Sequence, residues 1–253
     1  MTKTIPAEVV EHLRNAVRVA VLTGAGVSAE SGLPTFRQAQ TGLWSHYDPT
    51  ELATPEAFLR NPRLVWDWYA YRRRMAREAH PNPAHYALVT LEQHAANFTL
   101  ITQNIDGLHR RAGSQSILEL HGNLERIRRF DSGTDVETWD DDGQTPPRCP
   151  QTGELLRPSV VWFGEALPQQ ELRMAYSVAE QSDLFLAVGT SALVQPAASL
   201  PLIAKRAGAY VIEINPEETS LSVIADCCFR GKAGVVLPIL VRQAFGETEE
   251  AVG

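Results

Sequence analysis

The chain has 253 residues, of which 44% are hydrophobic, and its 23 lysines and arginines face 30 aspartates and glutamates, for a net charge of −7. This length and apolar content predict one large domain, or a domain with an inserted module, around a sizeable core. The negative charge argues against a dominant nucleic-acid-binding surface, so no specific nucleic acid is expected as a partner. No apolar run is long enough to span a bilayer, and no membrane association is expected.

The cysteine content is low: Cys149, Cys227 and Cys228 are the three cysteines of the sequence. A disulfide between the adjacent pair would be strained, so all three are interpreted as free thiols in a reducing compartment. Residues 1–14 lack a basic start followed by an apolar stretch, so no secretion signal is expected. These features predict a cytoplasmic protein.

Short β-rich apolar runs alternate with helical patterns along most of the chain. Runs that are apolar almost throughout suit parallel strands covered on both faces. The alternation predicts the α/β class, with a doubly wound, Rossmann-like parallel sheet and helices on both faces. In chain order, the expected elements are a helix at 6–16, strands at 17–22, 98–102, 116–120, 184–188 and 210–214, and further helices at 83–96, 168–180 and 196–207.

Two segments interrupt this alternation. Residues 55–79 are strongly helical and rich in tryptophan and tyrosine, whereas residues 123–157 are polar, acidic and turn-rich. We interpret them as two excursions that pack together as a smaller inserted domain. The predicted Rossmann-like domain comprises residues 1–37, 80–122 and 166–253, and the predicted small domain comprises residues 38–79 and 123–165.

A glycine-rich loop follows the first predicted strand directly. Gly24, Gly26 and Ala29 fit the G-x-G-x-x-G/A pattern of dinucleotide-binding loops. Glycine allows the backbone to turn tightly and approach a pyrophosphate, and a helix N-terminus there offers free N–H groups. This pattern alone is a weak signal.

Polar residues also follow other predicted strands, at the edge where open α/β sheets bind ligands. Gln103, Asn104 and Asp106 follow one strand, and His121 follows the next. Each has a structural alternative when taken alone: a histidine with no catalytic role, or an Asx turn at Asp106-Gly107. The same holds for residues 189–191 as a helix cap and 215–216 as a turn.

Taken together and in this order, the motifs resemble the sirtuins, the NAD-dependent protein-lysine deacylases. The resemblance implies NAD as cofactor and acylated-lysine proteins as substrates. It implies removal of the acyl group, with release of nicotinamide and O-acyl-ADP-ribose. The matching blocks are residues 24–37 (GAGVSAESGLPTFR), 102–109 (TQNIDGLH), 119–122 (ELHG), 160–165 (VVWFGE) and 189–191 (GTS).

The resemblance also implies residue roles. His121 is expected to be the general base that takes a proton from a ribose hydroxyl, a task suited to a group that titrates near neutral pH. Asp106 is expected to bind the nicotinamide carboxamide, and Asn104 to hold the nicotinamide ribose; these three are the predicted catalytic residues. The predicted NAD-binding residues are Gly24, Ala25, Gly26, Glu30, Phe36, Arg37, Gln103, Asn104, Ile105, Asp106, Gly189, Thr190, Ser191, Asn215 and Ala233.

Tyr69 and Arg72 lie three residues apart in a predicted helix, so a phenol and a guanidinium can point together. The pair suits a carboxylate. It resembles the tyrosine–arginine pair of the class III sirtuins, which remove succinyl, malonyl or related acidic acyl groups. The alternative is a helix with an aromatic core side and an exposed basic side. The predicted substrate-binding residues are Tyr69, Arg72, Val161, Phe163, Gly164, Glu165 and Val194.

One block departs from the family pattern. Most sirtuins hold a structural zinc with two C-x-x-C pairs, but here Arg129 and Ser132 occupy the expected positions of the first pair. At the second pair, Cys149 stands alone, with Thr152 three residues later. One thiolate cannot build a tetrahedral thiolate site, and carboxylates are poor replacements in a structural zinc site. We therefore predict no bound metal.

Three alternative functions are a Rossmann-type NAD-dependent dehydrogenase, a mono-ADP-ribosyltransferase and a non-catalytic NAD-sensing module. A dehydrogenase requires an acidic residue at the end of a second strand about 20 residues after the glycines, whereas residues 38–50 are loop-like. The presence of His121, Asn104 and Asp106 disfavours a non-catalytic module. Loss of the acyl group from a modified peptide, rather than gain of ADP-ribose, separates a deacylase from a transferase.

Overall fold

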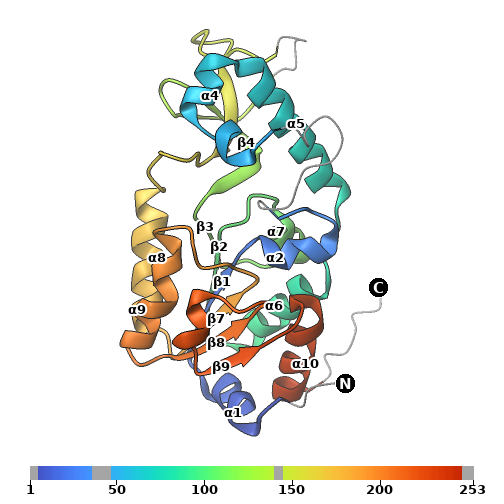
Figure 1. Cartoon of the computed structure of the whole chain (residues 1–253), viewed down its shortest axis with the longest axis vertical. Coiled ribbons are helices and arrows are strands. Elements are labelled where there is room, and N and C mark those ends of the chain that lie inside the picture. Colours follow the sequence, from blue (N-terminus) through green and yellow to red (C-terminus); the bar gives the residue numbers. More distant parts are fainter. Residues whose placement is uncertain (1–4, 36–46, 140–144, 247–253) are drawn as a thin grey trace.

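The structure is a computed structural model, and it describes residues 5–35, 47–139 and 145–246. It contains a six-stranded sheet, in the lower part of Figure 1, and a three-stranded sheet in the upper part. Within the described ranges, no helix combines the length and the apolar character that crossing a membrane requires.

The larger sheet has the strand order β3-β2-β1-β7-β8-β9, and every neighbouring pair is parallel. This arrangement confirms the predicted fold class. Two of the predicted strands, at 184–188 and 210–214, agree with the observed bounds at both ends. The strands are β1 (Arg18–Thr23), β2 (Asn97–Thr102), β3 (Ile117–Glu119), β7 (Leu184–Val188), β8 (Tyr210–Ile214) and β9 (Cys227–Phe229).

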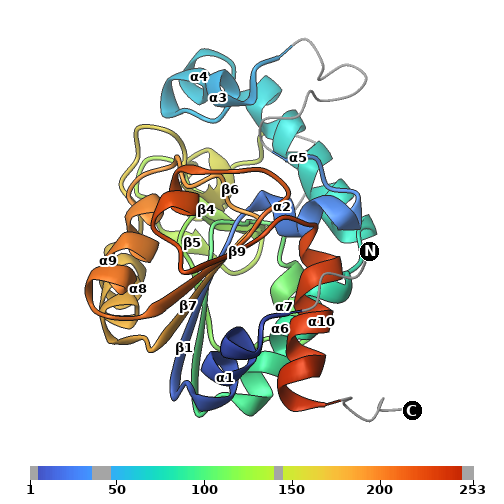
Figure 2. The same cartoon turned by 60° about the horizontal axis from the view of Figure 1, so that its bottom comes forward.

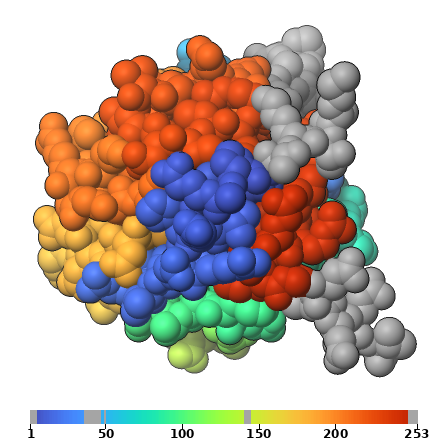
Figure 3. Space-filling view, turned by 90° about the horizontal axis from the view of Figure 1, so that it is seen from below, coloured from blue at the N-terminus to red at the C-terminus, as the bar shows by residue number. Residues whose placement is uncertain are grey.

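Helices cover both faces of this sheet, as Figure 2 shows. Because side chains alternate along a strand, Val19 and Val21 of β1 join the core on one face, and Ala20 and Leu22 join the core on the other. In Figure 3, α1 (blue) lies beside α10 (red). One face carries α1 (Ala7–Asn15), α6 (Pro83–His94) and α10 (Ala233–Phe245), and the other carries α8 (Gln169–Gln181) and α9 (Leu200–Arg206).

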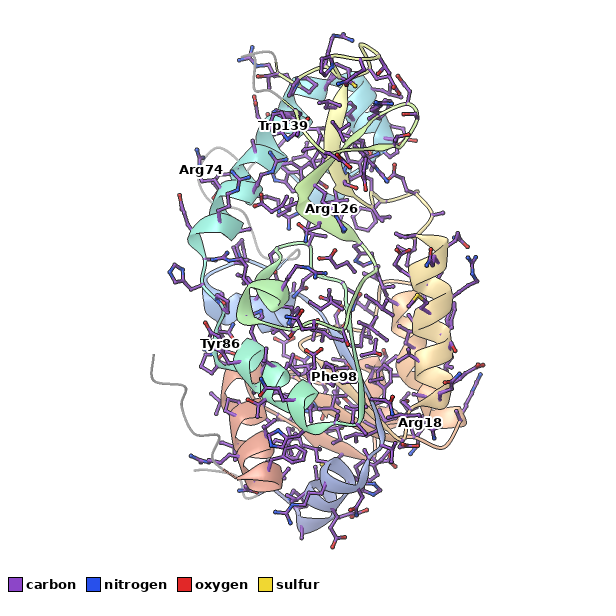
Figure 4. The ribbon with its side chains drawn as sticks, turned by 180° about the vertical axis from the view of Figure 1, so that it is seen from behind. Arg18, Arg74, Tyr86, Phe98, Arg126 and Trp139 are labelled. Atoms are coloured by element: carbon purple, nitrogen blue, oxygen red, sulfur yellow. The ribbon has the colours of Figure 1, made fainter. Side chains whose placement is uncertain are left out.

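The smaller sheet is antiparallel, with the order β5-β4-β6, and three helices pack with it. Its core is aromatic: the ring centroids of Phe58 and Trp162 lie 5.4 Å apart, and those of Trp66 and Trp139 also lie 5.4 Å apart. Figure 4 labels Trp139 near α5. We keep the division into two domains as a proposal and call these elements the small domain: α3 (Pro49–Leu52), α4 (Pro55–Arg60), α5 (Pro62–Glu78), β4 (Gly122–Arg129), β5 (Asp135–Val136) and β6 (Leu156–Val160).

Two predicted helices were wrong in detail. The helix expected over 55–79 is divided at Asn61, whose backbone is not helical (φ −149°, ψ 80°) and which caps α5 by accepting a hydrogen bond from the Leu64 N–H. Pro62 explains this break, because a proline disfavours helical backbone in the residue before it. The helix expected over 196–207 begins as a 3₁₀ turn, Ala197–Ser199, before α9.

Candidate active site

Five of the predicted site segments lie at the carboxyl edge of the larger sheet. Gly24 follows β1, Gln103 follows β2, His121 follows β3, Gly189 follows β7 and Asn215 follows β8. The strand order changes direction between β1 and β7, and ligands bind in open α/β sheets at such a switch point. A cavity of about 1010 Å³ opens there and extends to the small domain. Residues at the carboxyl edge of the larger sheet and residues of the small domain line it.

The glycines at this point allow two loops to meet backbone against backbone. The Gly26 N–H donates to the Gly189 carbonyl at 2.9 Å. A Cβ on Gly24 or Gly26 would lie 2.8 Å from that carbonyl oxygen, and a Cβ on Gly189, whose φ is +58°, would lie 2.6 Å from the Val27 nitrogen. The missing side chains keep this part of the cavity wall open, which fits the approach of a pyrophosphate.

The side chains of Asn104 and Asp106, which follow β2, are connected through Ser28. Its hydroxyl donates to Asp106 Oδ2 at 2.7 Å and accepts from Asn104 Nδ2 at 3.2 Å. Gln103 Nε2 donates to the Thr190 hydroxyl at 3.0 Å, which links the β2 loop to the β7 loop. Ser28 was missed among the predicted site residues, although it stands within the glycine-rich motif.

Asp106 combines both interpretations that the sequence allowed. Its Oδ1 accepts the Leu108 N–H at 2.9 Å, which is the Asx turn, while the residue also lines the cavity. Burial raises the pKa of Asp106, and the hydrogen bonds from Leu108 and Ser28 partly oppose this shift. The turn therefore holds the carboxylate at the cavity wall.

The ring of His121 is held in one tautomer. Its Nδ1 lies 3.0 Å from the Gln103 carbonyl oxygen, and since a carbonyl can only accept, Nδ1 carries the proton. In the neutral ring the lone pair is then on Nε2. Burial lowers the pKa of His121, and the bond to Gln103 partly opposes this shift. His121 therefore has one basic nitrogen available at neutral pH.

Gly122 explains why a glycine follows this histidine. Its φ is +78°, and a Cβ here would lie 2.1 Å from the Ser159 carbonyl oxygen. The residue pairs with Val160 of β6, and the Val161 N–H donates to the His121 carbonyl at 2.9 Å. This close contact fixes the histidine against the segment that follows β6.

The predicted adenosine side is held by internal hydrogen bonds. Asn215 Nδ2 donates to the Thr190 carbonyl at 2.8 Å. Glu30 Oε1 accepts the Gly234 N–H at 2.8 Å, so this carboxylate ties the first loop to the start of α10, beside Ala233. Ala25, Ile105, Ser191 and Val161 also line the cavity. Phe36 and Arg37, two predicted NAD-binding residues, lie outside the described residues.

Tyr69 and Arg72, on α5 of the small domain, both line the cavity. Burial raises the pKa of Tyr69 to about 12, so its hydroxyl stays protonated. Burial also lowers the pKa of Arg72, and the nearby Tyr69 and Asp106 side chains oppose this shift. The guanidinium carbon of Arg72 lies 5.0 Å from the centroid of the Trp68 ring. The neighbouring Arg73 is buried and donates to the Leu124 carbonyl, so α5 does not have a uniformly exposed basic side.

The Glu165 carboxylate, predicted to bind substrate, is engaged within the chain. It accepts hydrogen bonds from Arg157 at 2.5 and 3.0 Å, from Arg128 at 3.0 Å and from the Trp162 N–H at 2.8 Å. Arg157 is itself 2% exposed and lies over the Trp162 ring, 3.2 Å from its centroid. Burial raises the pKa of Glu165, but the two arginines outweigh it and the net shift is downward. The side chain of Glu165 therefore fixes the shape of the 161–165 segment.

Two exposed apolar lips border the cavity. Phe163 is 43% exposed on one lip, and Leu193 and Val194 are 60% and 41% exposed on the other. Gly164 (φ +86°) and Ala192 (φ +53°) turn the two lips out of extended geometry. The extended backbone available to an added strand is therefore short on each side.

The family model of the Sir2 family matches residues 24–196. The chain belongs to the Sir2 family of NAD-dependent protein deacylases. An NAD-dependent protein deacylase of Aquifex aeolicus is 51% identical over 222 residues, which cover 87% of this chain and 92% of that protein. NAD-dependent protein deacylase 1 of Pseudomonas aeruginosa is 49% identical over 245 residues, which cover 94% and 98%.

Solved structures of Sir2 proteins share the fold. A crystal structure of a Sir2 homologue in complex with NAD matches with a TM-score of 0.89 and 47% identity, over 95% of this chain and 94% of that one. A Sir2 complex with a p53 peptide and NAD⁺ matches with a TM-score of 0.82 and 32% identity, over 92% and 96%. Together with the glycine-lined wall, these matches make NAD the cofactor that this Sir2 protein uses.

The residues at the four expected zinc positions of this Sir2 protein do not fit that metal. Cys149 is the one sulfur donor among them, and the Arg129 guanidinium carries a positive charge where a ligand would stand. In the described part of the chain, no three His, Cys, Asp or Glu side chains come together as a metal site. The donor set is therefore not that of a structural zinc site.

The predicted role of His121 as general base, together with its environment, sets the pH dependence that we expect for activity. Catalysis by a general base requires the neutral ring, and burial lowers the pKa below the ordinary value of 6.5. Activity should therefore stay level through neutral pH and fall only as the pH drops below that value. A profile of kcat/KM against pH measures this, and an acidic limb with a midpoint above 7 would contradict it.

The role of Glu165 leads to a second prediction. Glu165→Gln removes the charge from four hydrogen bonds and should raise KM for the acylated peptide by about tenfold, while KM for NAD stays nearly constant. Steady-state kinetics with each substrate varied measures both constants. Glu180→Gln, on the exposed side of α8, is the matched control. Equal changes in both constants would mean that Glu165 supports the whole site.

Proposed function

We propose that this Sir2 protein removes succinyl, malonyl and also acetyl groups from protein lysines, with release of nicotinamide and O-acyl-ADP-ribose. One observation carries the proposal: a continuous cavity is lined by the glycine loop, by His121 and by the Tyr69–Arg72 pair. The proposed NAD-binding loop, the proposed base His121 and the Tyr69–Arg72 pair, which suits a carboxylate, thus line the same cavity. The cavity also opens between the two apolar lips, where an extended peptide can enter.

Several Sir2 structures support the reaction class. One is a triple mutant in complex with 2′-O-acetyl ADP ribose, and another contains a deacetylated p53 peptide and 3′-O-acetyl ADP ribose. These molecules contain the transferred acyl group and the ADP-ribose part of NAD. The expected products of this chain are of the same kind.

The residues of this chain supply binding, orientation and proton transfer. When bound, NAD provides an electrophilic ribose carbon with nicotinamide as its leaving group. Asp106 and Asn104 are expected to orient the nicotinamide and its ribose, since Ser28 holds both in place. His121 Nε2 is expected to accept a proton from a ribose hydroxyl, since Nδ1 donates to the Gln103 carbonyl and leaves Nε2 as the basic nitrogen.

The experiment that tests the function replaces His121 by tyrosine. His121→Tyr should reduce deacylation by about 10²- to 10⁴-fold, the usual effect of losing a general base. Mass spectrometry of an acylated peptide incubated with NAD measures the product, and His94→Tyr on the exposed side of α6 is the control. Gain of ADP-ribose by the peptide, in place of acyl loss, would favour the mono-ADP-ribosyltransferase.

The preference for acidic acyl groups depends on Arg72 and Tyr69. The neutral phenol of Tyr69 and the guanidinium of the half-buried Arg72 can both donate to a distal carboxylate, which an acetyl group lacks. Arg72→Met should lower the ratio of succinyl to acetyl kcat/KM by about tenfold or more.

The matched control is Arg74→Met, because Arg74 is exposed on the outer side of α5, as labelled in Figure 4. Competition between the two acylated peptides measures the ratio directly. If both activities fall equally in Arg72→Met, the residue positions α5 and does not select the acyl group.

We further propose that the small domain carries no zinc, on the basis of its donor set. The purified protein should contain no stoichiometric zinc, and chelators should leave its activity unchanged. Elemental analysis and assays after dialysis against EDTA measure the two quantities. One zinc per chain would overturn the proposal.

The proposed partners are proteins that carry acylated lysines. A peptide would lie between the lips formed by Phe163 and Gly164 on one side and Val194 on the other, and would add a short strand. The free state of Cys149, Cys227 and Cys228 supports a reducing, cytoplasmic setting as part of the same proposal.

A further inference from the structure

Two loops of the small domain meet around one carboxylate. Arg129 ends β4 and Ser132 lies in the loop that follows it; the second loop precedes β6 and contains Cys149 and Thr152. These are the four positions at which zinc-binding relatives are expected to carry cysteines. Glu154, two residues after Thr152, directs its carboxylate to three of them.

The contacts of Glu154 join both loops. Its Oε1 accepts the Ser132 N–H at 2.9 Å, and its Oε2 accepts the Thr152 hydroxyl at 2.8 Å. Arg129 Nε lies 3.9 Å from the same Oε2, with the two side chains 24% and 18% exposed. The Glu154 carbonyl also accepts the Cys149 N–H at 2.8 Å.

The number and kind of these contacts matter more than the ion pair. A lone pair of partly exposed charges at 3.9 Å contributes little. Here the carboxylate also receives an N–H from one loop and an O–H from the other, which are charge-assisted bonds. The Glu154 carboxylate thereby connects residues that are far apart in the sequence, as a bound metal ion would.

We propose that the Glu154 carboxylate clasps the two loops of the small domain and takes the place of the structural zinc. A cation, Arg129, stands where a thiolate is expected, and an anion, Glu154, joins the two loops where a metal cation would. The polarity of the junction is therefore reversed, while its connections are kept.

The clasp also fixes the start of the strand that leads to the substrate segment. The Phe130 N–H donates to the Leu155 carbonyl at 2.8 Å, and Leu156 begins β6 directly afterwards. Arg157 of the same strand holds Glu165. Glu154 therefore holds the loop that leads into β6, and β6 supports the 161–165 segment.

Hydrogen exchange tests the proposal without relying on activity. In Glu154→Gln the charge is lost at constant size, and protection of amides in residues 129–134 and 148–157 should fall about fivefold or more, with β1 and β7 unchanged. The thermal midpoint in EDTA should fall by about 2–4 °C. Glu137→Gln, an exposed carboxylate after β5, is the matched control and should match the wild type.

A second comparison separates the clasp from a general effect of Glu154. Arg129→Met removes only the ion pair and should reduce protection less than Glu154→Gln does, and the double variant should resemble Glu154→Gln alone, because both act on one contact network. If Glu154→Gln does not fold, Thr152→Val removes a single hydrogen bond and reports on the same amides.

The reverse exchange provides the sharpest test. The variant R129C/S132C/T152C, together with the native Cys149, supplies four thiols and should bind one zinc per chain. In the zinc-loaded triple variant, Glu154→Gln should no longer change the protection of these amides from exchange. Removal of the zinc with EDTA should reduce that protection. The proposal is overturned if E154Q exchanges like E137Q, or if EDTA alone reduces protection in the unmodified chain.

Discussion

The active site depends on the approach of two backbones at the switch point of the sheet. Gly24 and Gly26 after β1 and Gly189 after β7 leave no space for a Cβ. Parallel pairing of β1 with β7 brings their carboxyl ends together, and the missing side chains let the two loops form one wall. The Gln103–Thr190 bond connects the β2 loop to this wall, and Asn215 connects the β8 loop. Four strand ends thus hold one binding surface.

The second half of the site is placed by a comparable contact at Gly122. The approach of its Cα to the Ser159 carbonyl joins β4 to β6 directly after His121. The His121 ring and the lip that carries Phe163 are therefore fixed by the same pair of strands. Glu165 extends this arrangement, since Arg157 and Arg128, one from each strand, hold its carboxylate. The proposed base and the proposed peptide-binding segment are thus linked through backbone pairing.

The sequence predicted the parallel sheet well because buried strands form short apolar runs between turns; β7 and β8 were predicted at both ends. β9 and α10 had no predicted counterpart. β9 has three residues, too few to show a period, and α10 is apolar on several sides and contains Pro238. Most of the predicted residues that line the cavity lie within the sequence motifs, which is why they could be predicted. The hydrogen bonds that hold the Glu165 carboxylate could not be predicted. Arg128 and Arg157 lie on β4 and β6, and only the pairing of these strands brings both close to it. Asn61-Pro62, in contrast, was a local signal that divides α4 from α5.

A junction built on Glu154 differs from a thiolate–zinc junction in its response to oxidants. Peroxide converts zinc-bound thiolates to sulfenates and disulfides, which releases the metal and the loops it holds. A carboxylate, a hydroxyl, a backbone N–H and a guanidinium offer no such reaction. Cys149, 1% exposed, is the remaining thiol at the junction, and none of the Glu154 side-chain bonds passes through its sulfur. On the proposal made above, the small domain does not depend on a metal whose release by oxidation would free its two loops.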